Sequence, residues 1–256
     1  MRNLLILLLL PLLAYLALCA LMFFGQRSQI YFPVRESNPP GAAAMRLATD
    51  DGADLKIWVV PRAGPRALVY FGGNAEDVAG NLAAFTSAFP GHSLYLVNYR
   101  GYGGSTGSPS EAGLQADAAA IFDHLRGRHP EISVVGRSLG SGVAIHLASI
   151  RDVHRLVLVT PFDSLVNVAR EHFRYLPVGW LMRDRYESVR RVPAIRARTL
   201  VVIAGADEII PRARSAALVA AFPVQQIQAQ VLEGATHNGI DQMSQYLERI
   251  GEFLAE

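Results

Sequence analysis

A pentapeptide in the middle of the chain has the residue types and spacing of a catalytic nucleophile. The segment Gly136 to Gly140 (G-R-S-L-G) follows the apolar, β-branched run Ile132 to Val135 and opens an alanine-rich helical stretch. A G-x-S-x-G motif between a strand and a helix projects its serine from a sharp turn, the nucleophile elbow. Glycine fits two residues either side of the serine because larger side chains would collide there. The motif predicts nucleophilic catalysis by Ser138 and not a glycine-flanked turn with an incidental serine.

A serine hydroxyl needs a general base within hydrogen-bond reach and a carboxylate that orients that base. When such a triad is built on a parallel sheet, the acid and the histidine follow the serine in that order, each after a later strand. Among the seven histidines, only His237 lies in the loop after the last expected strand, in the segment Gly234 to Gly239. The other six fall in expected turns, helices or the start of a strand. We therefore predict that His237 is the base and not a surface histidine.

Three carboxylates compete for the orienting role. Asp207 stands at the end of the expected strand Leu200 to Ala204, where the third member of the triad belongs, and it is our choice. Glu208 is adjacent, but consecutive side chains leave the backbone in different directions, so its side chain should point away from the histidine. Asp163 also follows a strand end, and some hydrolases take their acid from that earlier strand. The structural role expected of Asp163 is that of a helix N-cap.

Negative charge that develops on a carbonyl oxygen needs preorganised donors, commonly two backbone N–H groups. Leu139, directly after the nucleophile, should supply one of them. The second should come from the loop that follows the strand Ala67 to Phe71, where two glycines and an asparagine let the backbone approach a ligand closely. We expect this donor to be the backbone N–H of Asn74 or Gly73.

The N-terminal segment is the most apolar part of the chain. Leu4 to Phe24 holds 21 residues without a charge, long enough at ~1.5 Å per residue to cross a hydrocarbon core of ~30 Å. No clean small-x-small cleavage site follows, so residues 1–25 are expected to be an uncleaved single-pass anchor, with a cleaved signal peptide as the rival. Flanking positive charges are nearly balanced. We place the catalytic domain on the outer, periplasmic or lumenal side.

Composition excludes several other classes of function. Charged residues are 18% of the chain, and 23 arginines and one lysine are spread along it, so nothing indicates nucleic-acid binding. The one cysteine, Cys19, lies within the apolar N-terminal segment, which excludes an intramolecular disulfide and a cysteine-based metal site. The sequence implies neither a metal nor an organic cofactor.

Residues 26–256 are expected to form one domain in which strands and helices alternate, which predicts a mainly parallel, twisted sheet with helices on both faces. An insertion of about 40 residues separates the strand that ends at Thr160 from the one that begins near Thr199. We expect a small helical cap at about 162–193, with an extra helix packed on the sheet as the alternative. The strand-like runs are Leu55 to Val60, Ala67 to Phe71, Leu94 to Tyr99, Ile132 to Val135, Leu156 to Thr160, Leu200 to Ala204 and Ile227 to Leu232.

Together these motifs resemble the Bem46-like branch of the α/β-hydrolase superfamily, whose members are single-pass membrane proteins and whose relatives include protein depalmitoylases. The resemblance covers most of the chain after residue 30 and implies Ser138, Asp207 and His237 as the triad. It also implies an oxyanion hole at Asn74 and Leu139. The segments that carry it are Phe71 to Ala75, Asn98 to Ser105, Gly136 to Gly140, Gly205 to Pro211 and Gly234 to Asn238.

The chain departs from that branch at one position. Members usually have histidine before the Gly-Asn of the oxyanion loop, and here Gly72 stands in its place. The exchange should loosen the loop or alter substrate preference without removing the backbone donors. Within Asn98 to Ser105, Arg100 and Tyr102 are expected to brace the loops near the site.

The sequence thus predicts a membrane-anchored serine hydrolase that cleaves a carboxylic ester or thioester through an acyl-enzyme on Ser138. The apolar insertion near a membrane favours a small-molecule or lipid-like acyl substrate. A serine peptidase or an acyltransferase would use the same triad. A catalytically silent scaffold that keeps the fold for partner binding is the alternative from another class.

Overall fold

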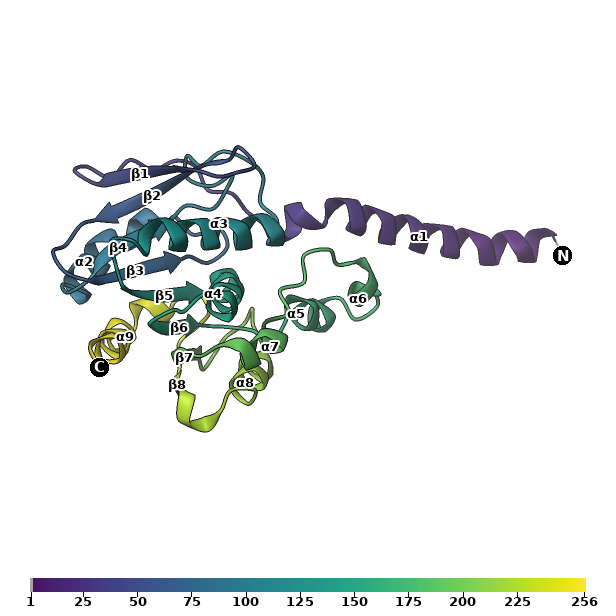
Figure 1. Ribbon diagram of the computed structural model, residues 1–256. Helices are drawn as coiled ribbons and strands as arrows, with labels where there is room; N and C mark the ends of the chain where they lie inside the picture. The colour runs from purple at the N-terminus through teal and green to yellow at the C-terminus, as the bar shows by residue number, and fades with distance from the viewer. Residues whose placement is uncertain (1) are drawn as a thin grey trace.

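An eight-stranded sheet forms the centre of the computed structural model, which describes residues 2–256, with side chains from residue 9 onward (Figure 1). The strand order is β1-β2-β4-β3-β5-β6-β7-β8. β2 runs antiparallel to both of its neighbours, and every pair from β4 to β8 in that order is parallel. The strands are β1 (Ala43–Ala48), β2 (Asp54–Val60), β3 (Arg66–Phe71), β4 (Ser93–Val97), β5 (Glu131–Arg137), β6 (Arg155–Val159), β7 (Arg198–Ala204) and β8 (Ile227–Leu232).

The inner strands are buried on both faces, which is why their sequences are unbroken apolar runs without alternation. β4 and β6 are buried along their whole length, and β3, β5 and β7 are buried at all but their first residue. The seven expected strands are confirmed, with ends that differ by a few residues. β1 was not predicted, because this edge strand is largely exposed and carries no apolar run.

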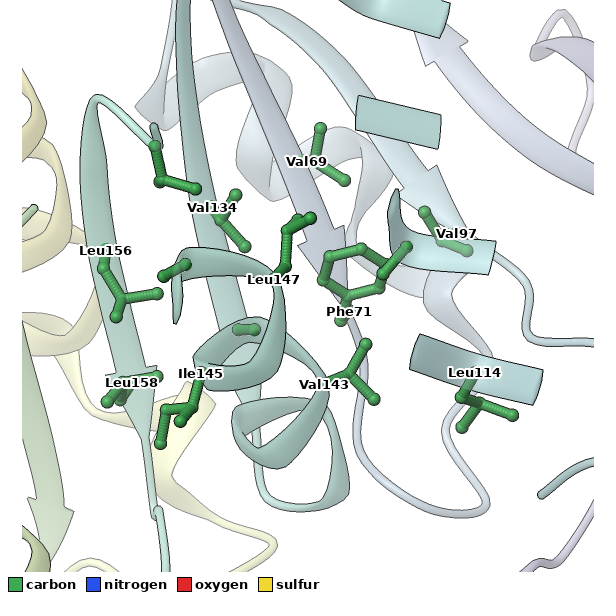
Figure 2. Close-up of a cluster of buried hydrophobic side chains, with 14 of the residues drawn as sticks. Val69, Phe71, Val97, Leu114, Val134, Val143, Ile145, Leu147, Leu156 and Leu158 are labelled. Carbon is green, nitrogen blue, oxygen red and sulfur yellow. The ribbon is translucent and has the colours of Figure 1, made fainter. Parts of the chain in front are cut away.

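Helices cover both faces of the sheet and bury two separate apolar clusters. α3 (Glu111–Leu125), α4 (Leu139–Ile150) and α8 (Arg212–Val219) contribute to one cluster, and α2 (Leu82–Ala88) and α9 (Ser244–Ala255) contribute to the other. Figure 2 shows Val143, Ile145 and Leu147 of α4 beside strand residues such as Val134 and Leu156. Ser138 stands at the N-terminus of α4, so this packing fixes the position of the elbow.

The insertion between β6 and β7 forms three short helices, α5 (Leu165–His172), α6 (Val178–Leu181) and α7 (Ser188–Arg191), followed by the short 3₁₀ turn η2 (Val192–Ala194). α5 and α6 stand beyond the C-terminal edge of the sheet (Figure 1). The expected small helical cap is therefore present as a structural element.

The N-terminal helix α1 runs from Arg2 to Ile30 and projects away from the sheet (Figure 1). Within the described residues it contains the one helical stretch, Leu9–Ile30, that is long and apolar enough to cross a membrane by length and composition. The helix continues beyond residue 25, where the expected anchor ends, and polar residues of this last part bind the insertion. Gln26, for example, donates to the carbonyl of Leu181 at 3.1 Å.

Candidate active site

The elbow has the backbone strain and close packing that its sequence predicts. β5 ends at Arg137, α4 begins at Leu139, and Ser138 between them has φ 49° and ψ −115°. A Cβ atom at Gly136 would lie 2.4 Å from the Gly140 carbonyl oxygen. A Cβ atom at Gly140 would lie 2.0 Å from the carbonyl oxygen of Phe71. Larger residues are excluded at both positions, and the serine is held at the tip of the turn.

The structure brings Ser138, His237 and Asp207 together at the C-terminal edge of the sheet, although they lie far apart in the sequence. His237 Nε2 is 2.9 Å from Ser138 Oγ. His237 Nδ1 is 2.8 Å from Asp207 Oδ2 and 3.0 Å from Oδ1. The side chains of His237 and Asp207 are only 5% and 3% exposed, so water screens this pair weakly.

The three carboxylates have different positions and partners. Asp207 Oδ1 accepts the backbone N–H groups of Ile209 and Ile210 at 2.9 and 2.7 Å, which fixes the carboxylate that faces the imidazole. Glu208 turns away from the imidazole ring and accepts the backbone N–H of His237 at 3.0 Å.

Asp163 does not reach the histidine and is not the N-cap expected of it. Its carboxylate accepts the backbone N–H of Ser164 at 2.8 Å and pairs with Arg214 at 3.2 Å. The residue that caps α5 is Ser164, whose hydroxyl accepts the backbone N–H of Asn167 at 3.1 Å. The cap therefore stands one residue later than the sequence led us to expect, because the extended backbone lies at Ser164.

The loop after β3 lies against the nucleophile, and one of its two alternative donors is already engaged. A Cβ atom on Gly73 would lie 3.7 Å from the Cβ of Ser138. The N–H of Gly73 already donates to Glu76 Oε2 at 2.6 Å, so the expectation that Gly73 is a free donor is not met. Of the two alternatives in this loop, the backbone N–H of Asn74 is the one that no hydrogen bond among the described residues occupies.

The side chain of Asn74 ties this loop to the exit of α1. Its amide nitrogen donates to the carbonyl of Ile30, and its carbonyl oxygen accepts the backbone N–H of Phe32 at 2.9 Å. Tyr102 donates its hydroxyl to the same oxygen at 2.9 Å. Arg100 pairs instead with Asp117 of α3 at 2.6 Å and with Asp51 at 2.7 Å, and among the described residues it forms no hydrogen bond or ion pair with the oxyanion loop. The bracing of this loop is therefore confirmed for Tyr102, and the end of α1 takes part in it.

Two charged residues contact the loops around Ser138 and His237, and their roles are not predicted by any sequence pattern. Glu76 accepts from Tyr70 at 2.6 Å as well as from Gly73, and it lies 3.6 Å from the guanidinium of Arg137. Arg137 also donates to the carbonyl of His237 at 3.4 Å. This guanidinium links the oxyanion loop, the elbow and the histidine loop. A single glutamate in a loop belongs to no sequence pattern that would predict its role, whereas Arg137 lies inside the G-x-S-x-G motif.

The space where a side chain at Gly72 would lie is already occupied. A Cβ atom there would approach Val78 Cγ1 to 2.7 Å and the Glu76 carboxylate to 3.3 Å. Val78 is 3% exposed and packed in the core. The loosening expected from glycine at this position is therefore countered by Val78 and Glu76, which fill the neighbouring space and hold the loop.

A cavity of about 990 Å³ opens beside Ser138 and His237. Its walls come from the oxyanion loop, the insertion and the last turns of α1. Most of the wall is apolar, and it includes Met22, Phe173, Leu176, Leu181 and Met182. Among the described residues, no group of three or more His, Cys, Asp or Glu side chains gathers as metal ligands would.

No family model matches the chain. It is 37% identical to an uncharacterized protein of Mycobacterium tuberculosis, over 96% of this chain and 95% of that protein. It is 30% identical to the alpha/beta hydrolase domain-containing protein 17C of Mus musculus, over 91% of this chain and 73% of that protein. The alpha/beta hydrolase domain-containing protein aho-3 of Caenorhabditis elegans is 31% identical over 73% of this chain and 57% of its own length.

Solved structures share the fold at low sequence identity. The esterase Pf2001 of Pyrococcus furiosus superposes with a TM-score of 0.72, covering 88% of this chain and 98% of its own, at 18% identity. A hydrolase from Pseudomonas aeruginosa gives a TM-score of 0.66 over 86% of this chain and all of its own, at 19% identity. The order of the strands, the nucleophile elbow and the named relatives all indicate the same family. The chain belongs to the α/β-hydrolase superfamily of enzymes.

Proposed function

We propose that the protein is a membrane-anchored serine hydrolase of the Bem46-like branch that cleaves a carboxylic ester or thioester with an apolar acyl chain. The observation that carries the proposal is the continuous series of contacts from Ser138 Oγ to His237 Nε2 at 2.9 Å and from His237 Nδ1 to Asp207 at 2.8 Å. A nucleophile, a base and an orienting group within this reach are what activated serine chemistry requires.

In this mechanism the carboxylate of Asp207 sets the tautomer of His237. An ionised carboxylate only accepts hydrogen bonds, so Nδ1 carries the proton and Nε2 is left to accept the Ser138 hydroxyl. Ser138 Oγ then attacks the carbonyl carbon while Nε2 takes the proton. The tetrahedral oxyanion is stabilised by the backbone N–H groups of Leu139 and Asn74.

Collapse of the tetrahedral intermediate breaks the bond to the alcohol or thiol, which leaves with the proton that His237 holds. Water then attacks the acyl-enzyme, gives its proton to Nε2, and the carboxylic acid departs as Ser138 recovers its hydrogen. Every proton passes through His237, so the short contacts on both sides of its ring bear on both halves of the reaction.

The apolar cavity supports the choice of acyl group. A volume of about 990 Å³ beside Ser138, walled mainly by aliphatic and aromatic side chains, suits a hydrocarbon chain, because burial of apolar surface is favourable in proportion to the area covered. The adjacent helix α1 supports a membrane anchor by its length and composition, and we place the catalytic domain on the outer side. Protease digestion of the domain in intact, right-side-out vesicles checks that placement, since protection would reverse it.

The test of the function is labelling of the full-length protein in detergent with a fluorophosphonate probe. We expect labelling that disappears in Ser138→Ala and persists in Ser149→Ala, a matched serine at the far end of the same helix whose hydroxyl donates to the His146 carbonyl. Hydrolysis of p-nitrophenyl butyrate and p-nitrophenyl palmitate should disappear with the same variant, with the longer chain preferred in kcat/KM. A folded wild-type protein that takes no label would overturn the proposal and favour the silent scaffold.

A further inference from the structure

The insertion between β6 and β7 binds α1 along much of the helix. Gln26 Oε1 accepts the backbone N–H of Arg183 at 2.7 Å, one turn from the end of the helix. Arg27 forms an ion pair with Asp184 at 2.9 Å, and the Asp184 side chain is 5% exposed. Far toward the N-terminus, the Tyr15 hydroxyl donates to the carbonyl of Tyr175 at 2.9 Å. The insertion therefore follows the helix outward, away from the sheet.

The length of this contact has a consequence for depth in a membrane. Tyr15 and Gln26 are 11 residues apart, which corresponds to ~16 Å along a helix axis. A hydrocarbon core is ~30 Å thick, and the stretch that could cross it is Leu9–Ile30. If α1 crosses the bilayer, the part of the insertion that is bound to it between Gln26 and Tyr15 enters the hydrocarbon core with it.

The outer side of the insertion has the residues that such a position requires. Trp180 is 93% exposed, Tyr175 is 90% exposed and Phe173 is 42% exposed. Trp and Tyr are the side chains enriched where membrane and water meet, because their rings are apolar and carry one polar group. On α1 itself, Leu21 and Phe24 are 70% and 81% exposed. Tyr15 and Leu18 of α1 line one hollow together with Phe173 and Tyr175, so the apolar surface of the helix continues onto the insertion.

The charges near this surface fit a lipid headgroup region. Arg183 is exposed, and its guanidinium lies 5.7 Å from the ring centre of Phe23 on α1. An exposed arginine at this level can reach an anionic headgroup while its stem stays among apolar groups. The carboxylate of Glu171 is paired with Arg214 of α8 at 3.0 Å.

The cavity beside Ser138 lies between these two membrane-facing elements. Met22 and Gln26 of α1 form part of its wall, and Leu176 and Met182 of the insertion form another part. A second hollow of about 420 Å³ lies farther out, against Tyr15 and Leu18, and it shares His172, Phe173 and Leu176 with the first. A hydrocarbon chain that lies beside α1 in the bilayer can therefore pass along these two hollows toward Ser138.

We propose that the tip of the insertion, from Phe173 to Trp180, is immersed in the bilayer beside α1, and that acyl substrates enter the cavity sideways from the hydrocarbon core. The lipid is the one occupant proposed for this surface, because the surface is continuous with the candidate membrane span. The immersion rests on the contacts with α1 and on the proposed membrane anchor, whereas the delivery of substrate rests on the proposed hydrolase activity.

Tryptophan fluorescence tests the immersion directly, because the chain contains two tryptophans in opposite environments. Trp58 is 3% exposed in the core, and Trp180 is 93% exposed in the structure without lipid. The full-length protein is reconstituted in phosphatidylcholine–phosphatidylglycerol vesicles, and the spectrum of Trp180→Phe is subtracted from that of the wild type to isolate Trp180. We expect blue-shifted emission that doxyl-labelled lipids quench and aqueous iodide does not. Emission of a water-exposed indole, quenched by iodide and not by doxyl lipid, would overturn the proposal.

A second measurement tests delivery with Trp180→Ser, because Trp180 does not line the cavity beside Ser138. Hydrolysis of soluble p-nitrophenyl acetate should match the wild type, whereas hydrolysis of a long-chain acyl thioester embedded in the vesicles should fall about tenfold by loss of interfacial anchoring. Trp180→Tyr should restore most of the rate. Equal rates on the embedded substrate would overturn lateral delivery. A protein whose Trp180 is quenched by lipid but whose Ser138 takes no fluorophosphonate would refute the proposed function and leave the immersion standing.

Discussion

Two neighbouring carboxylates at the active site contact the same histidine in different ways. Asp207 faces the imidazole ring and is itself held by two backbone N–H groups, whereas Glu208 binds the backbone N–H of His237. One side chain thus orients the ring and the other positions the loop that carries it. Adjacency in sequence did not make them interchangeable, because consecutive side chains leave the chain in different directions.

These different roles predict unequal losses of kcat when each carboxylate is replaced by the corresponding amide. Asp207→Asn should lower kcat on the order of 10³- to 10⁴-fold, because the amide no longer enforces the tautomer in which Nε2 is the base. Glu208→Gln, the matched control, keeps an oxygen that can accept the backbone N–H of His237, so its loss should stay below about tenfold. Steady-state hydrolysis of p-nitrophenyl butyrate measures both. A larger loss for Glu208→Gln at equal melting temperature would show that the assignment is wrong.

The oxyanion loop is the element most tightly fitted between its neighbours. Gly72→Ala should destabilise the fold by about 1–3 kcal/mol, because the new methyl group would stand 2.7 Å from Val78 Cγ1 in a packed core. Gly80→Ala, eight residues later, meets nothing within 4 Å and should be close to neutral. Thermal unfolding of the two full-length variants compares them, with a shift of about 2–4 °C per kcal/mol for a domain of this size. Equal melting temperatures would contradict the account of Gly72 as a sterically required glycine.

Elements with a strong periodic or apolar pattern could be predicted from the sequence, and so could the proximity of the three residues proposed as the triad. The inner strands were predictable because burial on both faces leaves an unbroken apolar run, and Ser138, Asp207 and His237 each follow such a run. β1 was missed because an exposed edge strand is held by backbone hydrogen bonds, which leave no trace in side-chain type. Glu76 was missed for a related reason, since its role depends on Gly73 and Arg137 meeting it in space.

At the scale of the whole molecule, the N-terminal helix is part of the active-site region as well as a candidate anchor. It lines the cavity with Met22 and Gln26, and its last residue Ile30 accepts a hydrogen bond from Asn74 in the oxyanion loop. No sequence pattern predicted that α1 would line the cavity, because an apolar helix of 29 residues indicates only a membrane segment. The division of the chain into an anchor at 1–25 and a separate domain at 26–256 therefore understates how the two depend on each other.

The stability of the whole molecule should fall in mild acid because three histidines are held in poorly hydrated positions. Burial lowers the pKa of His92 and of His129 below the usual value, and it lowers the pKa of His146 to about 4. In the unfolded chain a histidine titrates near ~6.5. As the pH falls below that value, these histidines become protonated in the unfolded chain while they stay neutral in the folded protein, so the equilibrium moves toward unfolding. The contribution of His146 is thus fully present above pH ~6.5 and is lost as the pH falls through about 4.

This predicts a particular change in pH dependence for His146→Gln, whose side chain is neutral throughout. The melting temperature of the wild type should drop progressively between pH 6.5 and 4, and the slope of that drop should be smaller in His146→Gln even if the variant is less stable at pH 7. His124→Gln, at an exposed position on α3, should keep the wild-type slope. The slope is the decisive readout, because lost packing lowers the melting temperature at every pH, whereas a lost protonation site changes how it varies. Parallel curves for the wild type and His146→Gln would show that acid acts on this fold through other groups.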